Sequence, residues 1–279
     1  MKNFTSLSPA QLLEVLVGDI MTKGRPEPEA FDYWNNLGDL SGRISQEQKF
    51  DQVIRILEMK APSKPLAAME SCGLLAFCMP LCFPIKKGLA RRDLKSVIER
   101  FDKCGGQLPV RINTFLFPFD REKARETLVQ ADFDPEVVEL MISALDDMED
   151  FVLIKDRDRL KRFVYRKGKD YYCYIDSLAE QLNLALDFPE YKRLSKKYLM
   201  EEIERNHEVI FPQDLAIKAQ DLAAVGIEMG EEAEEMMGML AEHCHLKPYD
   251  NQPRILLKQA KALKNSKLKR FFRNVRWIK

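Results

Sequence analysis

Histidine and glycine are both scarce in this sequence, with three and twelve copies in 279 residues. None of the histidines is followed by aspartate, which excludes a His-Asp hydrolase site. The sequence also lacks a Gly-x-Ser-x-Gly turn, a Walker loop and a dinucleotide fingerprint. We therefore expect a binding protein with no complete active site of its own, no metal and no cofactor.

Long apolar runs are also missing, since none reaches the roughly 18 residues that a transmembrane helix needs. The N-terminal segment carries Gln11, Glu14 and Asp19 among apolar residues at helical spacing, which is not the pattern of a signal peptide. We expect a cytoplasmic protein with no membrane partner. The six cysteines form no Cys-x-x-Cys pair, and Cys78 and Cys82 predict reduced thiols on one face of a buried helix.

Helical patterning is what the sequence does contain. Strict apolar alternation is nearly absent, with strand character only at 151–154 and 171–174, and no repeat of 34 or 40 residues marks a solenoid. We predict an all-α fold, an elongated array of about a dozen helices. The capping residues expected to start helices are Ser8-Pro9, Ser45, Asp120, Asp134-Pro135 and Asp156. Among the expected helices are 64–83, 93–104, 156–167, 171–186, one from Pro189, 212 to about 226, 231–243, and one from Pro253 into the basic end.

Two short motifs invite a chemical interpretation. Gly105-Gly106-Gln107 could cradle a phosphate or match the tip of peptide release factors, but a glycine pair after a helix favours a simple turn. Asp156-x-Asp158 could hold a metal if it stood on a strand. Residues two apart on a helix do not share a face, so this pair predicts a cap and ion pairs instead.

His243-Cys244-His245 is the one cluster of metal-ligand types in the sequence. Three consecutive residues at a helix end supply at most two ligands in workable geometry, and no partner set stands nearby in the sequence. We interpret the cluster as incidental.

Charge is balanced overall, at 44 basic and 44 acidic residues, but it is unevenly distributed. From Asn251 to Lys279 there are ten Lys and Arg and no acidic residue. Dense cations suit phosphates, and the interleaved Phe271, Phe272 and Trp277 suit base stacking. The alternative is a helix that packs Leu256, Leu263 and their apolar neighbours on the body, with lysines that are only solvated.

Three stretches, in order, resemble the helical C-terminal half of bacterial tRNA nucleotidyltransferases, the family of CCA-adding enzymes and poly(A) polymerases. The first, 44–80, is similar to the neck pattern Ile-Ser-x-Glu-Arg, a helix, Gly-Leu-Leu and Pro. The second, 158–170, resembles a body segment before a long helix. The third, 211–244, is the most specific and contains Asp221-Leu222, Gly226 and Gly230 at the spacing of the family's C-terminal pattern.

The sequence departs from the family in ways that bear on activity. The catalytic head would precede residue 40, where its glycine-serine turn and paired aspartates have no room. The segment 105–111 and Arg91-Arg92-Asp93 echo head motifs but follow the neck, Gln48 replaces the neck arginine, and the mid-body His-Asp pair is absent near 112–119. We therefore expect no nucleotidyl transfer by this chain.

The resemblance implies a neck-like region 1–105, a body-like region 106–205 and a tail-like region 206–279 that bind structured RNA, in particular tRNA. Gly230 opens a helix, but the acidic turn Glu231 to Glu235 would repel RNA, so we exclude it from the binding surface. The expected RNA-binding residues are Lys258, Lys261, Lys264, Lys267, Lys269, Arg270, Arg273 and Arg276 in the basic end, and Arg159, Lys161, Arg162 and Arg166 in a second cluster.

Two alternatives stay open at this point. The chain could be a separately encoded subunit, or the C-terminal piece, of an enzyme that needs a nucleotidyltransferase head. In that case the neck helix around 31–57 should expose an apolar face with no internal mate. The chain could also be a helical protein–protein scaffold with no role in RNA binding.

Overall fold

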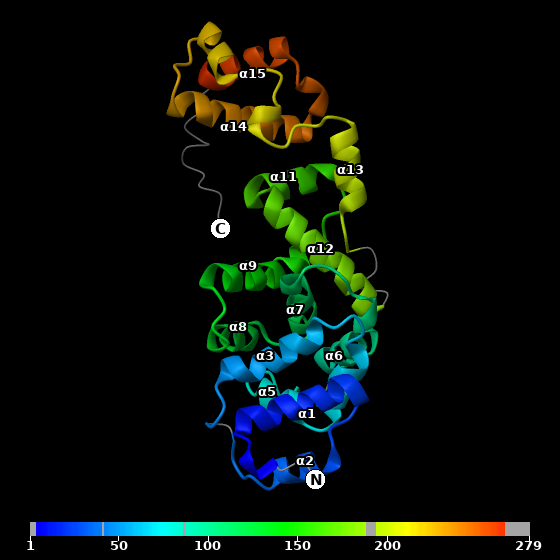
Figure 1. Cartoon of the computed structure of the whole chain (residues 1–279). Helices are drawn as coiled ribbons and strands as arrows, with labels where there is room; N and C mark the ends of the chain where they lie inside the picture. Colours follow the sequence, from blue (N-terminus) through cyan, green and yellow to red (C-terminus); the bar gives the residue numbers. More distant parts are fainter. Residues whose placement is uncertain (1–3, 41, 86–87, 188–193, 266–279) are drawn as a thin grey trace. The chain divides into compact units, whose positions relative to one another are not determined.

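The computed structural model describes residues 4–40, 42–85, 88–187 and 194–265. The described residues contain fifteen α-helices, a few short 3-10 turns and no strand, so the predicted all-α fold is confirmed (Figure 1). Of the two segments with strand character, 171–174 is helical throughout and 151–154 begins at the end of a helix and leaves it as a turn, because tertiary packing overrides weak local propensity. Within the described residues, no helix is both long enough and apolar enough to span a bilayer.

The chain folds into two compact units. Unit 1 comprises Met1–Val152 and Tyr174–Ser195; unit 2 comprises Leu153–Cys173 and the chain from Lys196 on, so the division falls inside one helix, α12 (Lys169–Leu186). The regions 1–105, 106–205 and 206–279 are defined by the sequence resemblance and stay a prediction.

Unit 1 is built from helices whose apolar faces share a core rich in Leu, Ile, Phe and Met. Two of its longer helices follow the expected caps: Ser8 and Ser45 each form a reciprocal capping box with a glutamine three residues later. Its helices are α1 (Pro9–Lys23), α2 (Pro28–Asn35), α3 (Gln46–Leu57), α4 (Ser63–Ser71), α5 (Leu74–Cys78), α6 (Leu89–Arg100), α7 (Leu108–Leu116), α8 (Arg121–Gln130), α9 (Pro135–Asp146), α10 (Met148–Val152) and residues 174–186 of α12.

Unit 2 is organised around α14 (Glu231–Leu246), which packs against α11 (Arg157–Lys167) and α15 (Pro253–Asn265), as Figure 1 also shows. A further helix, α13 (Lys197–Arg205), packs on α11. The described part of the unit also contains three 3-10 turns: η4 (Pro212–Asp214), η5 (Ala219–Val225) and η6 (Pro248–Asp250). Leu222, Met236, Leu240 and Leu256 are buried in its core.

One expected helix of unit 1 is wrong. The segment 64–83 forms α4 and α5, which are separated at Gly73, whose φ of 80° lies in the left-handed region. A left-handed residue breaks the helical ladder, and glycine adopts it without steric cost. Cys82 is therefore buried outside the helix that ends at Cys78, although all six thiols are free as expected.

The expected helix over 212–226 is also wrong, since this segment forms the separate turns η4 and η5. Two aspartates mark two separate starts within the segment. Asp214 accepts hydrogen bonds from the backbone N–H groups of Ile210 and Phe211, and Asp221 accepts one from that of Lys218. A side chain that binds the N–H three residues earlier is a contact of a helical start, so the segment holds one turn that begins after Phe211 and another that begins after Lys218.

Candidate nucleic-acid interface

Helix α11 begins and ends as its sequence predicts. The Asp156 carboxylate accepts a hydrogen bond from the Arg159 backbone N–H at 2.9 Å, which is an N-cap, and Gly168 ends the helix with a φ of 90°. Asp158 forms an ion pair with Lys161 at 3.3 Å. The prediction that Asp156-x-Asp158 serves as a cap and ion-pair partner is therefore confirmed.

The cations of α11 divide into two faces, and the inner face is occupied by ion pairs. Arg157 Nη1 lies 2.6 Å from Glu208 Oε1, and Lys161 Nζ lies 2.6 Å from Glu208 Oε2. The Lys161 side chain is 0% exposed. Lys161 is therefore a correction to the predicted RNA-binding set, because a buried ammonium group that already contacts a carboxylate cannot reach a phosphate.

The outer face of α11 carries three exposed arginines: Arg159, Arg162 and Arg166. At 100° per residue their spacing places them within about 60° of arc, and the first and last are about 10 Å apart along the helix. Their contacts within the described residues are weak or absent. Arg159 Nε is 3.6 Å from Asp156, Arg162 donates to the Asp158 carbonyl at 3.3 Å, and Arg166 has no ion pair or hydrogen bond there.

Helix α15 has the same division into an apolar face and a basic face. Leu256 and Ala260 are buried in the core of unit 2, and Lys258 and Lys261 are exposed on the opposite side. Arg254 joins them, because positions four and seven residues apart share a helix face. The sequence prediction missed Arg254, although its place in the acid-free segment after Asp250 could have identified it.

Lys264, also predicted to bind RNA, has an intramolecular partner. It is half-buried, and its ammonium group donates a hydrogen bond to the carbonyl of Gly226 at the end of η5. A cation at the carboxyl end of a helical turn is a common capping contact. We therefore assign Lys264 to the packing of α15 on η5. The remaining predicted residues, Lys267, Lys269, Arg270, Arg273 and Arg276, lie outside the described residues.

Helix α14 differs from α11 and α15, because its amino end is acidic. Gly230 precedes the helix, and its first turn carries Glu231, Glu232 and Glu234. These carboxylates stabilise the helix dipole and repel phosphate. We therefore leave this turn outside the candidate interface, for the reason already inferred from the sequence: its carboxylates repel phosphate.

Gly105 and Gly106 form a turn that is packed within unit 1. The Gly105 N–H donates a hydrogen bond to Gln181 at 2.7 Å, and Gly106 has a φ of 86°. Arg111 donates three hydrogen bonds to backbone carbonyls, two of them just after α3 or at its end. The prediction that Gly105-Gly106 forms a simple turn is therefore confirmed. Arg111, in the same segment, has a structural role.

The three side chains of His243-Cys244-His245 have separate surroundings. His243 Nε2 contacts Asp250 at 2.8 Å, whereas the Nε2–H of the buried His245 donates to the Ile210 carbonyl at 2.8 Å. Burial raises the pKa of Cys244 to about 11 and lowers that of His245. Within the described residues, no cluster of three or more His, Cys, Asp and Glu could hold a metal ion.

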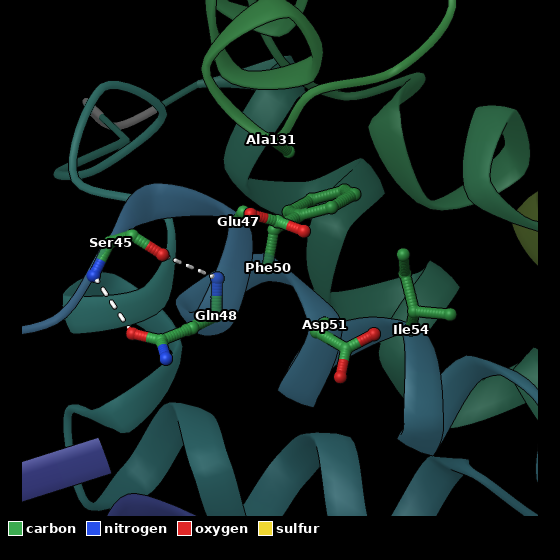
Figure 2. Close-up of a pocket in the computed structure, with 7 residues that line it drawn as sticks. All are labelled: Ser45, Glu47, Gln48, Phe50, Asp51, Ile54 and Ala131. Atoms are coloured by element: carbon green, nitrogen blue, oxygen red, sulfur yellow. Dashed lines mark hydrogen bonds between the residues drawn. The ribbon is translucent and has the colours of Figure 1, made fainter.

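A cavity of about 500 Å³ lies beside the start of α3, in unit 1. Figure 2 shows the Ser45–Gln48 capping box at one side, with the carboxylates of Glu47 and Asp51 along the rim and Ala131 opposite. Among the described residues, two carboxylates and no cation line this cavity, so its charge opposes that of a phosphate site. We therefore leave it outside the candidate nucleic-acid interface.

A scan against protein-family models and a search of curated proteins gave no match to this chain.

Proposed function

We propose that this chain binds structured RNA, with tRNA as the leading candidate, and does not itself join nucleotides. The support is physical: two helices of unit 2 present exposed cations on one face while their other faces pack into the protein. The sequence resemblance to the C-terminal half of tRNA nucleotidyltransferases supports the choice of RNA as the polyanion. The same resemblance, without its head signature, supports a role in binding alone.

The observation that carries this proposal is the division of cations on α11. Arg157 and Lys161 are held by Glu208, whereas Arg159, Arg162 and Arg166 are exposed on the outer face. Arginines that are exposed and held only by long contacts remain available to an external anion. Arginine also binds phosphate through two parallel hydrogen bonds, which makes it well suited to a nucleic-acid backbone.

The second support is the basic face of α15, with Arg254, Lys258 and Lys261 exposed and without ion-pair partners in the part of the chain that the structure describes. Their positive charges are not offset by acidic residues on the same helix, since the chain has none after Asp250. A face of uncompensated charge attracts polyanions and makes binding dependent on salt.

The test is tRNA binding measured against salt concentration. A variant with Arg159, Arg162 and Arg166 all changed to Gln should bind at least tenfold more weakly near 0.1 M salt. The slope of log K against log salt should become shallower by about two to three, because each lost phosphate contact removes roughly one unit or slightly less.

A charge-matched control separates a local surface from net charge. Arg25, Arg43 and Lys95 are exposed cations of unit 1, and changing all three to Gln removes the same charge. The proposal predicts near wild-type affinity and slope for this control. Equal losses in both triple variants, or wild-type binding with no salt dependence, contradicts the proposal.

The separate-subunit hypothesis led us to expect that the neck helix around 31–57 would expose an apolar face. In α3, however, Phe50, Val53, Ile56 and Leu57 are fully buried within unit 1. A separate nucleotidyltransferase head as partner stays a prediction, as does the scaffold role. Co-purification with a head protein, or purification free of RNA, would support these alternatives respectively.

A further inference from the structure

Tyr249 is the most exposed large hydrophobic side chain in the part of the chain that the structure describes, at 89%. It stands in the 3-10 turn η6, which joins α14 to α15. Leu246, at the end of α14, is also exposed at 59%. A tyrosine ring normally buries much of its apolar surface, so a ring that is left almost wholly in solvent needs a reason.

The turn that carries Tyr249 is fixed on both sides. On one side, Asp250 contacts His243 at 2.8 Å, which ties η6 back to α14. On the other, the Asn251 side chain accepts a hydrogen bond from the Ala216 N–H at 2.7 Å and donates to the Asp214 carbonyl at 3.2 Å. The exposure of Tyr249 therefore belongs to an anchored turn, not to a loose end.

The exposed charged residues from 247 to 265 are basic. Lys247 precedes Tyr249, Arg254 and Lys258 follow it, and all three are exposed. The one acidic residue between Lys247 and Asn265 is Asp250, whose carboxylate contacts His243. An exposed aromatic ring whose sequence neighbours are exposed cations suits the two parts of a nucleotide, a flat base and an anionic phosphate.

We propose that the ring of Tyr249 is a stacking platform for an unpaired base of the bound RNA. Lys247 and Arg254 contact the phosphates on either side of that base. The inference rests on the proposed function, and it adds a specificity: the η6 turn selects a loop or a single-stranded end, because bases within a duplex have no free face to offer. The cations of α11 and α15 contact phosphates whether the strand is paired or not.

The experiment compares two RNA probes of the same length, a fluorescein-labelled 12-nucleotide oligouridine and a 12-base-pair RNA duplex. Tyr249→Ala should weaken oligouridine binding about tenfold, in the range expected for the loss of one stacked base. Duplex binding should change less than twofold. Tyr249→Phe keeps the ring and should retain wild-type affinity for both probes.

Tyr198 supplies the matched control. It is an exposed tyrosine at 55% in the same unit, and its surroundings on α13 are of mixed charge: Lys197 precedes it, and Glu201 and Glu202 follow one turn later. Tyr198→Ala should leave the affinity for both probes unchanged, because the two carboxylates one turn away repel the backbone of RNA. Both alanine variants remove side chains that are mostly in solvent, so wild-type melting temperatures are expected.

The outcomes separate this inference from the proposed function. If wild-type protein binds both probes with a salt dependence and Tyr249→Ala changes neither, or weakens both equally, the stacking role is wrong and the proposed function stands. If Tyr198→Ala weakens oligouridine binding as much as Tyr249→Ala does, the assignment of base stacking to the η6 turn is also wrong. If wild-type protein binds neither probe nor tRNA, both proposals fail together.

Discussion

Lys161 and Glu208 form an ion pair that is withdrawn from solvent: the Lys161 Nζ lies 2.6 Å from Glu208 Oε2, and the two side chains are 0% and 5% exposed. The two residues are 47 positions apart in the chain, so the pair fixes α11 to the segment that follows α13. Arg157 contacts the other carboxylate oxygen. This relationship orients α11 and determines which of its arginines remain available.

Breaking this pair should destabilise unit 2. Glu208→Gln leaves the buried Lys161 ammonium with Asp158 alone, and we expect a loss of about 3 kcal/mol in the free energy of unfolding. Lys161→Met should cost less, because Arg157 still compensates the Glu208 carboxylate. Urea unfolding of both single variants measures the loss.

The double variant Lys161→Met/Glu208→Leu is the control for this prediction. With both side chains apolar, neither position 161 nor position 208 holds a buried charge, so part of the lost stability should return. The recovery is incomplete because Arg157 has lost Glu208. All folded variants should keep wild-type affinity for tRNA at low temperature. Weak tRNA binding by a fully stable Lys161→Met would show that Lys161 belongs to the RNA surface after all.

Helix starts could be predicted from the sequence because caps act over short distances. Ser8, Ser45, Asp120 and Asp156 each accept a hydrogen bond from a backbone N–H three residues ahead, so a short window contains the whole interaction. The same locality explains the failure at 212–226. There the local contacts of Asp214 and Asp221 mark two starts, after Phe211 and after Lys218, where we expected one.

The sequence predicted which residues of the candidate site are basic, but not which of them are exposed. Lys161 is buried because it pairs with Glu208, and no rule of helical spacing connects two residues so far apart in the chain. A partial signal was available: Lys161 follows Leu160 and precedes Val164 by three, so it lies beside the buried stripe. Tyr249 gave no signal, since exposure is a property of the fold.

His245 should make the stability of unit 2 dependent on pH. Its ordinary pKa is 6.5, and burial lowers it in the folded protein, where Nδ1 is buried without a partner among the described residues. The unfolded chain takes up a proton at this residue as pH falls through 6.5, whereas folded His245 takes it up only at a lower pH. Stability is therefore full above about pH 7.5 and falls on acidification, by at most about 1.4 kcal/mol per pH unit.

The variant His245→Gln isolates this effect. Glutamine keeps an N–H donor for the Ile210 carbonyl but does not titrate, so the stability of the wild type relative to the variant should fall between pH 7.5 and pH 5.5. His207 and His243 are present in both proteins and cancel in the difference. A difference that stays constant over this range contradicts the prediction.

Arg111 should be required for the stability of unit 1. Its guanidinium donates to the carbonyls of Leu57 at 2.7 Å, Met59 at 3.0 Å and Cys104 at 2.6 Å, and it lies over the ring of Phe101. Lysine cannot reproduce this planar fork, so Arg111→Lys should cost roughly 2 kcal/mol. Urea unfolding measures the loss, with the exposed Arg43→Lys as a control that should change stability by less than about 0.5 kcal/mol.

Gly18 and Gly238 test how closely helices approach their neighbours. Both lie inside continuous helices, but only Gly238 has another side chain close to where a Cβ would stand. A Cβ at Gly18, in α1, would meet no atom within 4 Å, so Gly18→Ala should stabilise unit 1 by about 0.5–1 kcal/mol. A Cβ at Gly238, in α14, would lie 3.1 Å from the hydroxyl oxygen of Tyr165, which packs from α11. Gly238→Ala should therefore gain less or lose stability.

The double variant Tyr165→Phe/Gly238→Ala completes this comparison. Removing the hydroxyl opens the contact, so adding Ala in this background should recover the stabilisation of about 0.5–1 kcal/mol that a helical Gly→Ala change normally gives. Thermal unfolding of the single and double variants measures the coupling between the two positions. A Gly238→Ala gain equal to that of Gly18→Ala in the wild-type background would mean that α11 and α14 are less closely packed than the Tyr165 contact requires.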